Sequence, residues 1–290
     1  MNRDFIRFER PADRVARIVL ARDDMRNAQN TQLLYELNDA FDEAACNDDI
    51  SVIILAADGD HFSAGHDITE FDFKKNIDAY ETVGVWSGFH GEGVEALYAR
   101  EREIYLEFSE RWRNIPKPTI AEVQGMAIAG ALLLIWPCDL IVAAEDARFL
   151  DNTVEMGVGG VEYFAHVGEL GPRKAKEYLF TADWITAEEA HRLGMVNHVV
   201  APEKLSADTL ALAQRIAKKP LFALKLAKEA ANTMEDAAGR VAGMKNAFHL
   251  HHLAHSHNMV RFGMPVDPSG VPEKIRDKIM KHVAVLKGER

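Results

Sequence analysis

The chain has 290 residues, of which 48% are hydrophobic and 27% charged, the balance of a globular protein with a sizeable core. Its 45 acidic residues outnumber 34 basic residues, and the net charge of -11 argues against a protein that binds nucleic acid or an anionic membrane. The two cysteines argue against a disulfide framework, and the charged first residues are unlike a secretory leader, so we expect a cytoplasmic protein.

Strand-like and helix-like segments alternate through the first two thirds of the chain. Runs rich in β-branched and apolar residues predict strands at 15–20, 51–57, 119–123 and 138–144. Between the first two strands, apolar residues at helical spacing predict a helix over 31–44. The nearly continuous apolar run at 51–57 is typical of a strand in a parallel sheet that helices cover on both faces. This order indicates an α/β core with crossover connections.

After about residue 200 the pattern becomes helical. The predicted helices span 202–219, 221–234, 236–260 and, after a stretch rich in proline and glycine, 274–287. We therefore expect an α/β core over residues 1–200 and a helical C-terminal region over residues 201–290, which would serve oligomerisation and cover the active site.

Two turns join a predicted buried strand to a helix through glycine. The first contains Gly65 and the second contains Gly125 and Gly130. Glycine lets a ligand approach the main chain closely, and the N–H groups at the start of a helix have no internal partner. Two such N–H groups aimed at one point can hold a developing oxyanion. Each turn alone is more typical of tight packing, so the pair is what indicates a site.

Together with the motifs around them, the two turns resemble the crotonase superfamily, the enoyl-CoA hydratase/isomerase family. The matching segments occur in family order and include Arg26-Asn27-Ala28, Phe62-Ser63-Ala64-Gly65-His66-Asp67, Lys117-Pro118-Thr119, Gln124-Gly125, Cys138-Asp139, Gly171-Pro172-Arg173 and Gly194-Met195-Val196. The resemblance implies an α/β fold, a crotonase-like spiral of ββα units with a C-terminal helical region. It also implies a homotrimer or a dimer of trimers that binds acyl-CoA thioesters, with coenzyme A as part of the substrate and no permanently bound cofactor.

The same resemblance implies particular site residues. The backbone N–H groups of His66 and Gly130 correspond to the family's oxyanion-hole donors for the thioester carbonyl. The residues that correspond to the coenzyme A site are Arg22, Arg26, Ala64, His66, Asp67 and Ile68. Beside these arginines, Asp23 and Asp24 replace the usual proline and lysine. The His66 imidazole has two interpretations: a contact with coenzyme A or substrate, or a solvated side chain.

The two glutamates with which hydratases of this family activate water are missing. Their positions hold Leu133 and Thr153, and neither side chain can act as a carboxylate acid or base. We predict that a carboxylate displaced along the same wall takes over. Glu162 is the first candidate because it lies within one residue of an aspartate that works in some relatives, and an apolar pocket is expected to raise its pKa. Asp151 and Glu155 are alternatives, each also consistent with a capping or surface role.

The chain is longer between Asp67 and Gln124 than in a compact hydratase of the family. The additional segment is rich in aromatic residues, namely Phe71, Phe73, Tyr80, Trp86, Phe89, His90 and Tyr98. They form either the wall of a pocket for a bulky or ring-bearing acyl group, or a helical elaboration whose aromatics are buried against the body or a neighbouring subunit.

Histidines are concentrated in one predicted helix. They are His249, His251, His252, His255 and His257. Pairs three or four residues apart share a helix face, a spacing that a metal site can use. Because no Asp, Glu or Cys nearby in the sequence completes a ligand set, we expect no metal and interpret this face as a subunit contact.

The leading hypothesis is therefore an enzyme of enoyl-CoA hydratase/isomerase type that acts on an unsaturated, bulky acyl-CoA. Its oxyanion hole would stabilise a thioester enolate while Glu162 moves a proton, a scheme compatible with isomerisation, hydration or ring-cleaving hydrolysis. The alternative is a non-catalytic acyl-CoA-binding or assembly protein that has kept the fold and lost the hydratase glutamates.

Overall fold

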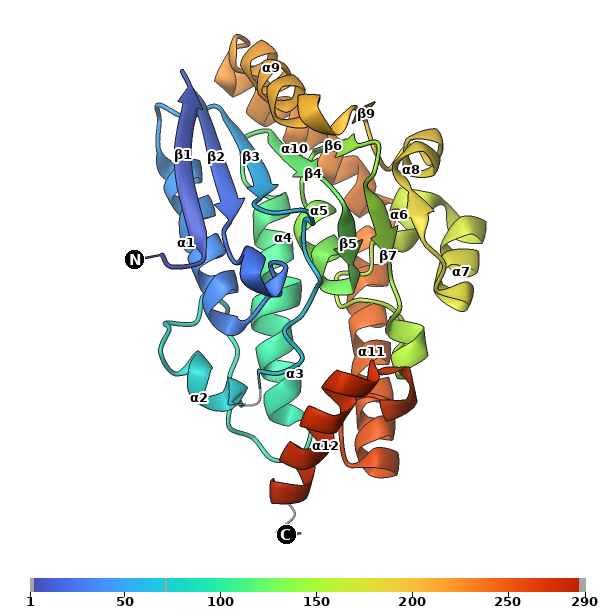
Figure 1. Cartoon of the computed structure of the whole chain (residues 1–290). Coiled ribbons are helices and arrows are strands. Elements are labelled where there is room, and N and C mark those ends of the chain that lie inside the picture. The colour runs from blue at the N-terminus through green and yellow to red at the C-terminus, as the bar shows by residue number, and fades with distance from the viewer. Residues whose placement is uncertain (1–2, 71, 287–290) are drawn as a thin grey trace.

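A six-stranded sheet with strand order β1-β2-β3-β4-β6-β9 forms the centre of the computed structural model, which describes residues 3–70 and 72–286 (Figure 1). Its strands are β1 (Ile6–Ala12), β2 (Val15–Leu20), β3 (Val52–Ala57), β4 (Thr119–Val123), β6 (Leu140–Ala144) and β9 (His198–Val200). The first two strands form an antiparallel hairpin, and the other neighbours pair in parallel. Parallel neighbours require crossover connections, which the helices supply.

A second, three-stranded sheet contains the short strands β5 (Met126–Ile128), β7 (Arg148–Leu150) and β8 (Ile185–Thr186). Strand β5 follows β4 almost directly, and β7 follows β6 in the same way. Each of these long strands is therefore followed by a short strand in the second sheet and then by a helix, which is the ββα repeat expected from the sequence.

Helices cover both faces of the large sheet. They are α1 (Thr31–Cys46), α2 (Phe73–Ile77), α3 (Glu95–Glu101), α4 (Phe108–Arg113), α5 (Leu132–Ile135), α6 (His166–Leu170), α7 (Pro172–Thr181), α8 (Ala187–Leu193), α9 (Leu205–Ala217), α10 (Leu221–Ala237), α11 (Arg240–Phe262) and α12 (Glu273–Leu286). Helix α1 begins where the Asn30 side chain accepts a 2.9 Å hydrogen bond from the Leu33 N–H. Helix α9 packs on the opposite face, with Leu212 in one apolar cluster with Val52 and Ile54.

Helices α3 and α4 are joined by a π-helical stretch, Arg102–Glu107, into one helix that runs beside the sheet (Figure 1). This helix ends the inserted segment. It buries the polar residues Glu101, Glu103 and Tyr105 in the interior of the molecule. Wide helical turns of this kind are rare and frequently occur at functional sites.

The long elements confirm the sequence-based expectations. The strands predicted at 15–20, 51–57, 119–123 and 138–144 are present with small shifts at their ends, and the four C-terminal helices lie close to their predicted bounds. Strand β1 was not predicted, because its charged residues and a proline are typical of an edge strand with weak patterning.

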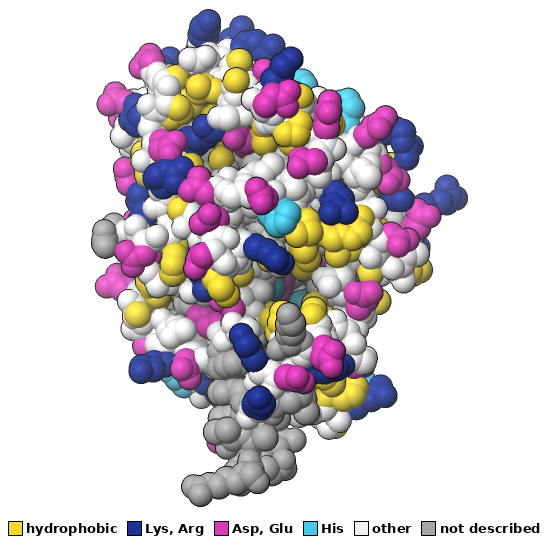
Figure 2. Space-filling model, viewed as in Figure 1, with side chains coloured by type: hydrophobic (Ala, Val, Ile, Leu, Met, Phe, Trp, Pro, Cys, Tyr) yellow, Lys and Arg dark blue, Asp and Glu magenta, His cyan; other side chains and the backbone are white. Residues whose placement is uncertain are grey.

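The surface of the molecule is mixed in charge. Among the described residues on the face in Figure 2, acidic and basic side chains are interspersed rather than gathered into one basic area. Within the described part of the chain, no helix is long and apolar enough to cross a membrane.

Candidate active site

The two glycine turns lie side by side and are joined by main-chain hydrogen bonds. The Ser63 N–H donates to the Met126 carbonyl at 3.2 Å, and the Ile128 N–H donates back to Ser63 at 3.1 Å. Gly65 has a φ of +85° and sits so close to the second turn that an added Cβ would lie 2.5 Å from the Ile128 carbonyl oxygen. Likewise, a Cβ at Gly130 would lie 3.0 Å from the His66 nitrogen. Only glycine fits these two positions.

The N–H groups of His66 and Gly130 are therefore brought together as the sequence predicts. Neither donates a hydrogen bond to an acceptor within residues 3–70 and 72–286. The residue before the second donor, Ala129, has a φ of +44°, a conformation that a non-glycine residue adopts at a cost. Two free donors at adjoining turns are the geometry that stabilises an oxyanion.

The imidazole of His66 is held in place rather than solvated. Its Nε2 lies 3.2 Å from an oxygen of Glu162, and its ring stacks on Tyr105 with 3.9 Å between the centroids. Its Nδ1 is buried and has no hydrogen-bond partner in the described structure. One residue thus contributes a backbone donor to the turn and a side chain that holds a carboxylate beside it.

Glu162 is buried and its other carboxylate oxygen lies 3.5 Å from Nε2 of His251. Burial raises the pKa of the Glu162 carboxyl, but the charges of His66 and His251 outweigh burial, so the pKa lies below its ordinary value. The expectation of a raised pKa is therefore wrong. The surroundings of Glu162 are not purely apolar, because two histidines from distant parts of the chain lie beside its carboxylate.

The positions of the two hydratase glutamates contribute no charge to this site. Leu133 is buried in the main apolar core, and its carbonyl accepts a hydrogen bond from the Ser109 hydroxyl at 2.9 Å. The Thr153 hydroxyl donates to Asp151 at 2.6 Å. Both side chains therefore have structural partners and no acid/base function.

Asp151 is a buried anchor for the loop that leads to Glu162. It accepts hydrogen bonds from the N–H groups of Thr153 and Val161, each at 3.0 Å, and pairs with Nε2 of His166 at 2.8 Å. Burial raises its pKa, but the hydrogen bond and charge of His166 outweigh burial and hold the pKa below its ordinary value. Glu155 is exposed. Of the three candidate carboxylates, Glu162 is the one at the glycine turns.

The chain is similar to enoyl-CoA hydratases over most of its length. A family model described as enoyl-CoA hydratase/isomerase matches residues 10–266. The chain is 43% identical over 263 residues to "Putative enoyl-CoA hydratase EchA13" of Mycobacterium tuberculosis, covering 88% of this chain and 81% of that protein. It is 36% identical to a crotonyl-CoA hydratase of Syntrophomonas wolfei, with coverage of 76% and 78%. The crystal structure of a probable enoyl-CoA hydratase from Mycobacterium smegmatis superposes with a TM-score of 0.82 at 46% identity, covering 91% of this chain and 99% of that one.

The chain belongs to the enoyl-CoA hydratase/isomerase family. The crotonase-like fold predicted from the sequence is thereby confirmed. The similarity to enoyl-CoA hydratases supports an enzyme of the crotonase type.

The residues predicted for the family's coenzyme A site gather at the first glycine turn. The Ala64 N–H donates to the Arg26 carbonyl at 2.9 Å, and Arg22 pairs with Asp67 at 2.9 Å. Arg26 and Ile68 are exposed. The charge of Arg22 is thus partly neutralised within the protein, whereas Arg26 is open to a phosphate. Their role toward coenzyme A stays a prediction.

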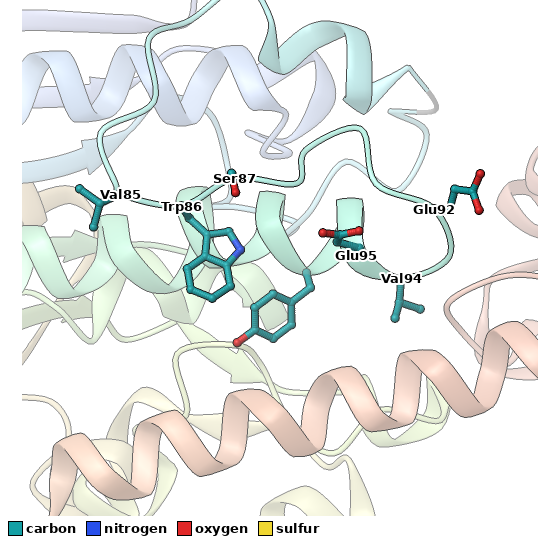
Figure 3. Close-up of a pocket in the computed structure, with 7 residues that line it drawn as sticks. Val85, Trp86, Ser87, Glu92, Val94 and Glu95 are labelled. Atoms are coloured by element: carbon teal, nitrogen blue, oxygen red, sulfur yellow. The ribbon is translucent and has the colours of Figure 1, made fainter.

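The inserted segment lines an open cavity of about 620 Å³ at the surface (Figure 3). It is lined by Val85, Trp86, Ser87, Glu92, Val94, Glu95 and Tyr98. The rings of Trp86 and Tyr98 are 5.8 Å apart, and Tyr98 also contacts His252 of α11 at 4.7 Å between centroids. Other aromatics of the segment are structural: Tyr80 stacks on Tyr35 at 4.3 Å. Phe71 and the side chain of Phe73 lie outside the described residues. The buried-aromatic interpretation therefore holds for Tyr80, and the role of the cavity residues toward an acyl group stays a prediction.

The histidines of α11 divide into two groups. His251, His252 and His255 are buried inside the chain, so their interpretation as a subunit-contact face is wrong. His249 and His257 are exposed. No carboxylate close in the sequence completes a ligand set with the buried histidines, but the fold brings one from a distant segment.

The missing carboxylate is Glu101 of α3, with Oε2 3.2 to 3.6 Å from the Nε2 atoms of the three buried histidines. Glu101 and Tyr105 were not predicted as site residues, because they lie in a segment dense in charged residues, a composition typical of a solvent-exposed helix. The available signal was helical spacing: with Ala96 and Ala99, these residues are buried along one helix.

Proposed function

We propose that this enzyme shifts a double bond in an unsaturated acyl-CoA thioester by moving one proton. The observation that carries the proposal is the position of Glu162: a buried carboxylate, 3.2 Å from the His66 imidazole, beside the two free N–H groups. Coenzyme A enters as part of the thioester, and no separate organic cofactor takes part.

The reaction follows from the chemistry of a thioester. The N–H groups of His66 and Gly130 donate to the carbonyl oxygen, which stabilises negative charge there. Glu162 removes a proton from the α-carbon, and the electrons of the broken C–H bond form a dienolate. The same proton then bonds to the γ-carbon, and the double bond moves from the β,γ to the α,β position. Atoms and charges balance without water or an oxidant.

Isomerisation is favoured over hydration because it needs one carboxylate instead of two. The same group accepts the proton and returns it. Hydration by the usual route requires a second carboxylate to activate water, and the corresponding positions hold Leu133 and Thr153 with other partners. The cavity beside Trp86 and Tyr98 supports a bulky or ring-bearing acyl group as the natural substrate.

The C-terminal helices support a homotrimer or a dimer of trimers. Large apolar side chains on α10 and α11 are exposed in the single chain, namely Phe222, Leu226, Met234, Leu250, Leu253 and Val260. Exposed apolar surface of this extent is typical of a subunit contact. Light scattering coupled to size-exclusion chromatography should give a multiple of three chains, and a monomer would contradict this assembly.

The test of the function is a pair of assays on purified protein and on E162Q. One assay follows conjugation of a β,γ-enoyl-CoA by ultraviolet absorption, and the other follows hydration of an α,β-enoyl-CoA. We expect isomerase turnover in the wild type and a loss of about 100- to 10,000-fold in E162Q, with acyl-CoA affinity retained.

The matched control is E155Q, the same change at an exposed glutamate. Full isomerase activity in E162Q would exclude Glu162 as the acid/base. Hydration without isomerisation would contradict the proposed reaction and show that the enzyme is a hydratase. Binding of acyl-CoA without any turnover of enoyl, dienoyl or cyclic esters would favour the non-catalytic alternative.

A further inference from the structure

A cluster of potential metal ligands lies in the interior between α3 and α11. Its members are Glu101, His251 and His255, whose exposed fractions are only 5 to 6%. Their ligand atoms all lie within 4.8 Å of one another. The two Nε2 atoms of His251 and His255 are 2.8 Å apart, and Oε2 of Glu101 lies 3.6 and 3.4 Å from them.

The hydrogen-bond pattern determines which nitrogens carry hydrogen. Nδ1 of His251 lies 2.8 Å from the Gly160 carbonyl, and Nδ1 of His255 lies 2.6 Å from the Pro265 carbonyl. A carbonyl oxygen only accepts, so both Nδ1 atoms must be the donors. In neutral rings, both Nε2 atoms then present lone pairs, and they face each other and a carboxylate oxygen. With both rings neutral, three electron-pair donors converge with no hydrogen to share, so the cluster needs a positive charge: either a proton on one Nε2, or a metal ion in its place.

We propose that Glu101, His251 and His255 bind a divalent transition-metal ion, for which Zn²⁺ is the best match. Ligands about 2.0 to 2.2 Å from a tetrahedral Zn²⁺ are roughly 3.3 to 3.6 Å apart, close to two of the three distances here. The third distance, 2.8 Å, lengthens when a cation enters between the nitrogens. Imidazole ligands favour zinc over magnesium or calcium, which prefer sites built of oxygen.

The surroundings have two further features of metal sites. Metal-binding histidines usually donate their other N–H to a carbonyl or carboxylate, as both histidines do here. Next to the cluster, His252 has two buried ring nitrogens without a hydrogen-bond partner, and its Nε2 lies 3.2 Å from Oε2 of Glu101. A fourth position is therefore available to His252 or to a water molecule.

The ion would connect three parts of the chain at the edge of the active site. Glu101 comes from the inserted segment, the histidines come from α11, and the Gly160 carbonyl belongs to the loop two residues before Glu162. Occupation of the site would hold this loop against α11. The inference is independent of the reaction that the enzyme catalyses, because it rests on ligand geometry alone.

The test measures metal binding by the full-length protein after treatment with a chelator and dialysis. Titration with Zn²⁺ by calorimetry should give one ion per chain. Co²⁺ should give visible absorption bands typical of a tetrahedral nitrogen and oxygen site. H255Q and E101Q should lose at least about 100-fold in Zn²⁺ affinity, whereas H257Q, on the exposed side of the same helix, should bind as the wild type does.

A second measurement, the melting temperature with and without Zn²⁺, tests the proposal even if one variant folds poorly. Zn²⁺ should raise the melting temperature of the wild type and of H257Q but not of H255Q, because binding to the folded state alone stabilises it. Less than about a tenth of an equivalent of bound Zn²⁺, with no thermal shift, would overturn the proposal and leave a shared proton as the positive charge in the cluster. Equal loss of binding in H257Q would place the ion on surface histidines and overturn it as well.

Discussion

The Nε2 atom of His66 lies 3.2 Å from a carboxylate oxygen of Glu162, although 96 residues separate the two in the chain. The backbone N–H of the same histidine is one of the two free donors at the glycine turns. The position of the carboxylate is thus tied to the position of the proposed oxyanion site through a single residue. A substitution that removes the His66 ring therefore separates the contribution of the imidazole from that of the backbone N–H.

Replacing His66 by alanine removes the imidazole and keeps the backbone N–H. In H66A, Glu162 loses the 3.2 Å partner and the Tyr105 ring loses its stacking neighbour. We expect kcat to fall by about 10- to 100-fold with little change in KM, because a misplaced catalytic group affects the chemical step more than binding. Steady-state kinetics measure kcat and KM separately. H257A is the control, and a change confined to KM in H66A would instead indicate a role in binding coenzyme A.

Replacing Gly130 by alanine introduces a Cβ into the space between the two turns. The added atom would lie 2.5 Å from Nδ1 of His66 and 3.0 Å from its backbone nitrogen. Both donors must move, and loss of one oxyanion donor typically costs about 100- to 1,000-fold in turnover. G159A is a matched control because nothing lies within 4 Å of a Cβ at that position. Activity of G130A near that of the wild type would show that the N–H groups do not bind the thioester oxygen.

The sequence predicted the two glycine turns and the α/β fold because both depend on local patterns. Gly65 and Gly130 are required by the backbone itself, and the long strands have unbroken apolar runs. The partners of Glu162 could not be predicted from the sequence, because they depend on long-range contacts rather than on local patterns. His66 comes from the first glycine turn, Glu101 from α3 and His251 from α11. These distant segments come together only in the folded chain, so no local sequence pattern indicates their contacts. For the same reason, the expected rise in the Glu162 pKa was wrong.

Truncating Trp86 tests whether the cavity in the inserted segment selects the acyl group. The ring lines the cavity and lies 5.8 Å from the Tyr98 ring. In W86A we expect kcat/KM for bulky acyl-CoA esters to fall by about tenfold or more relative to a four-carbon ester, the effect of removing a large apolar contact. V83A lies in the same segment but not in the cavity lining, so it should leave the ratio of kcat/KM for bulky and four-carbon esters unchanged. Equal losses for short and bulky esters would indicate that the aromatic pair is structural.

Replacing Asp151 by asparagine tests the anchor beneath Glu162. The carboxylate accepts from two backbone N–H groups and pairs with His166 at 2.8 Å, and both side chains are fully buried. Breaking a buried pair by neutralising one partner costs about 3 to 5 kcal/mol of folding free energy. Urea unfolding of D151N should show this loss, and D183N, at an exposed position, should show little. A loss below about 1 kcal/mol would contradict a stabilising ion pair between Asp151 and His166.

The pH dependence of stability has a specific source in Glu169 of α6. Burial raises the pKa of its carboxyl to about 8, and the nearby Glu235 contributes in the same direction. In the unfolded chain the group titrates near its ordinary value, so between about pH 5 and 8 the folded state retains a proton that the unfolded state has lost. The folded state then binds more protons than the unfolded state, and stability falls as the pH rises through this range. The variant E169Q cannot ionise and should lack this fall. Melting temperatures of the two proteins should be similar at pH 5, and E169Q should be the more stable protein at pH 8. Parallel curves across the range would contradict a raised pKa at Glu169.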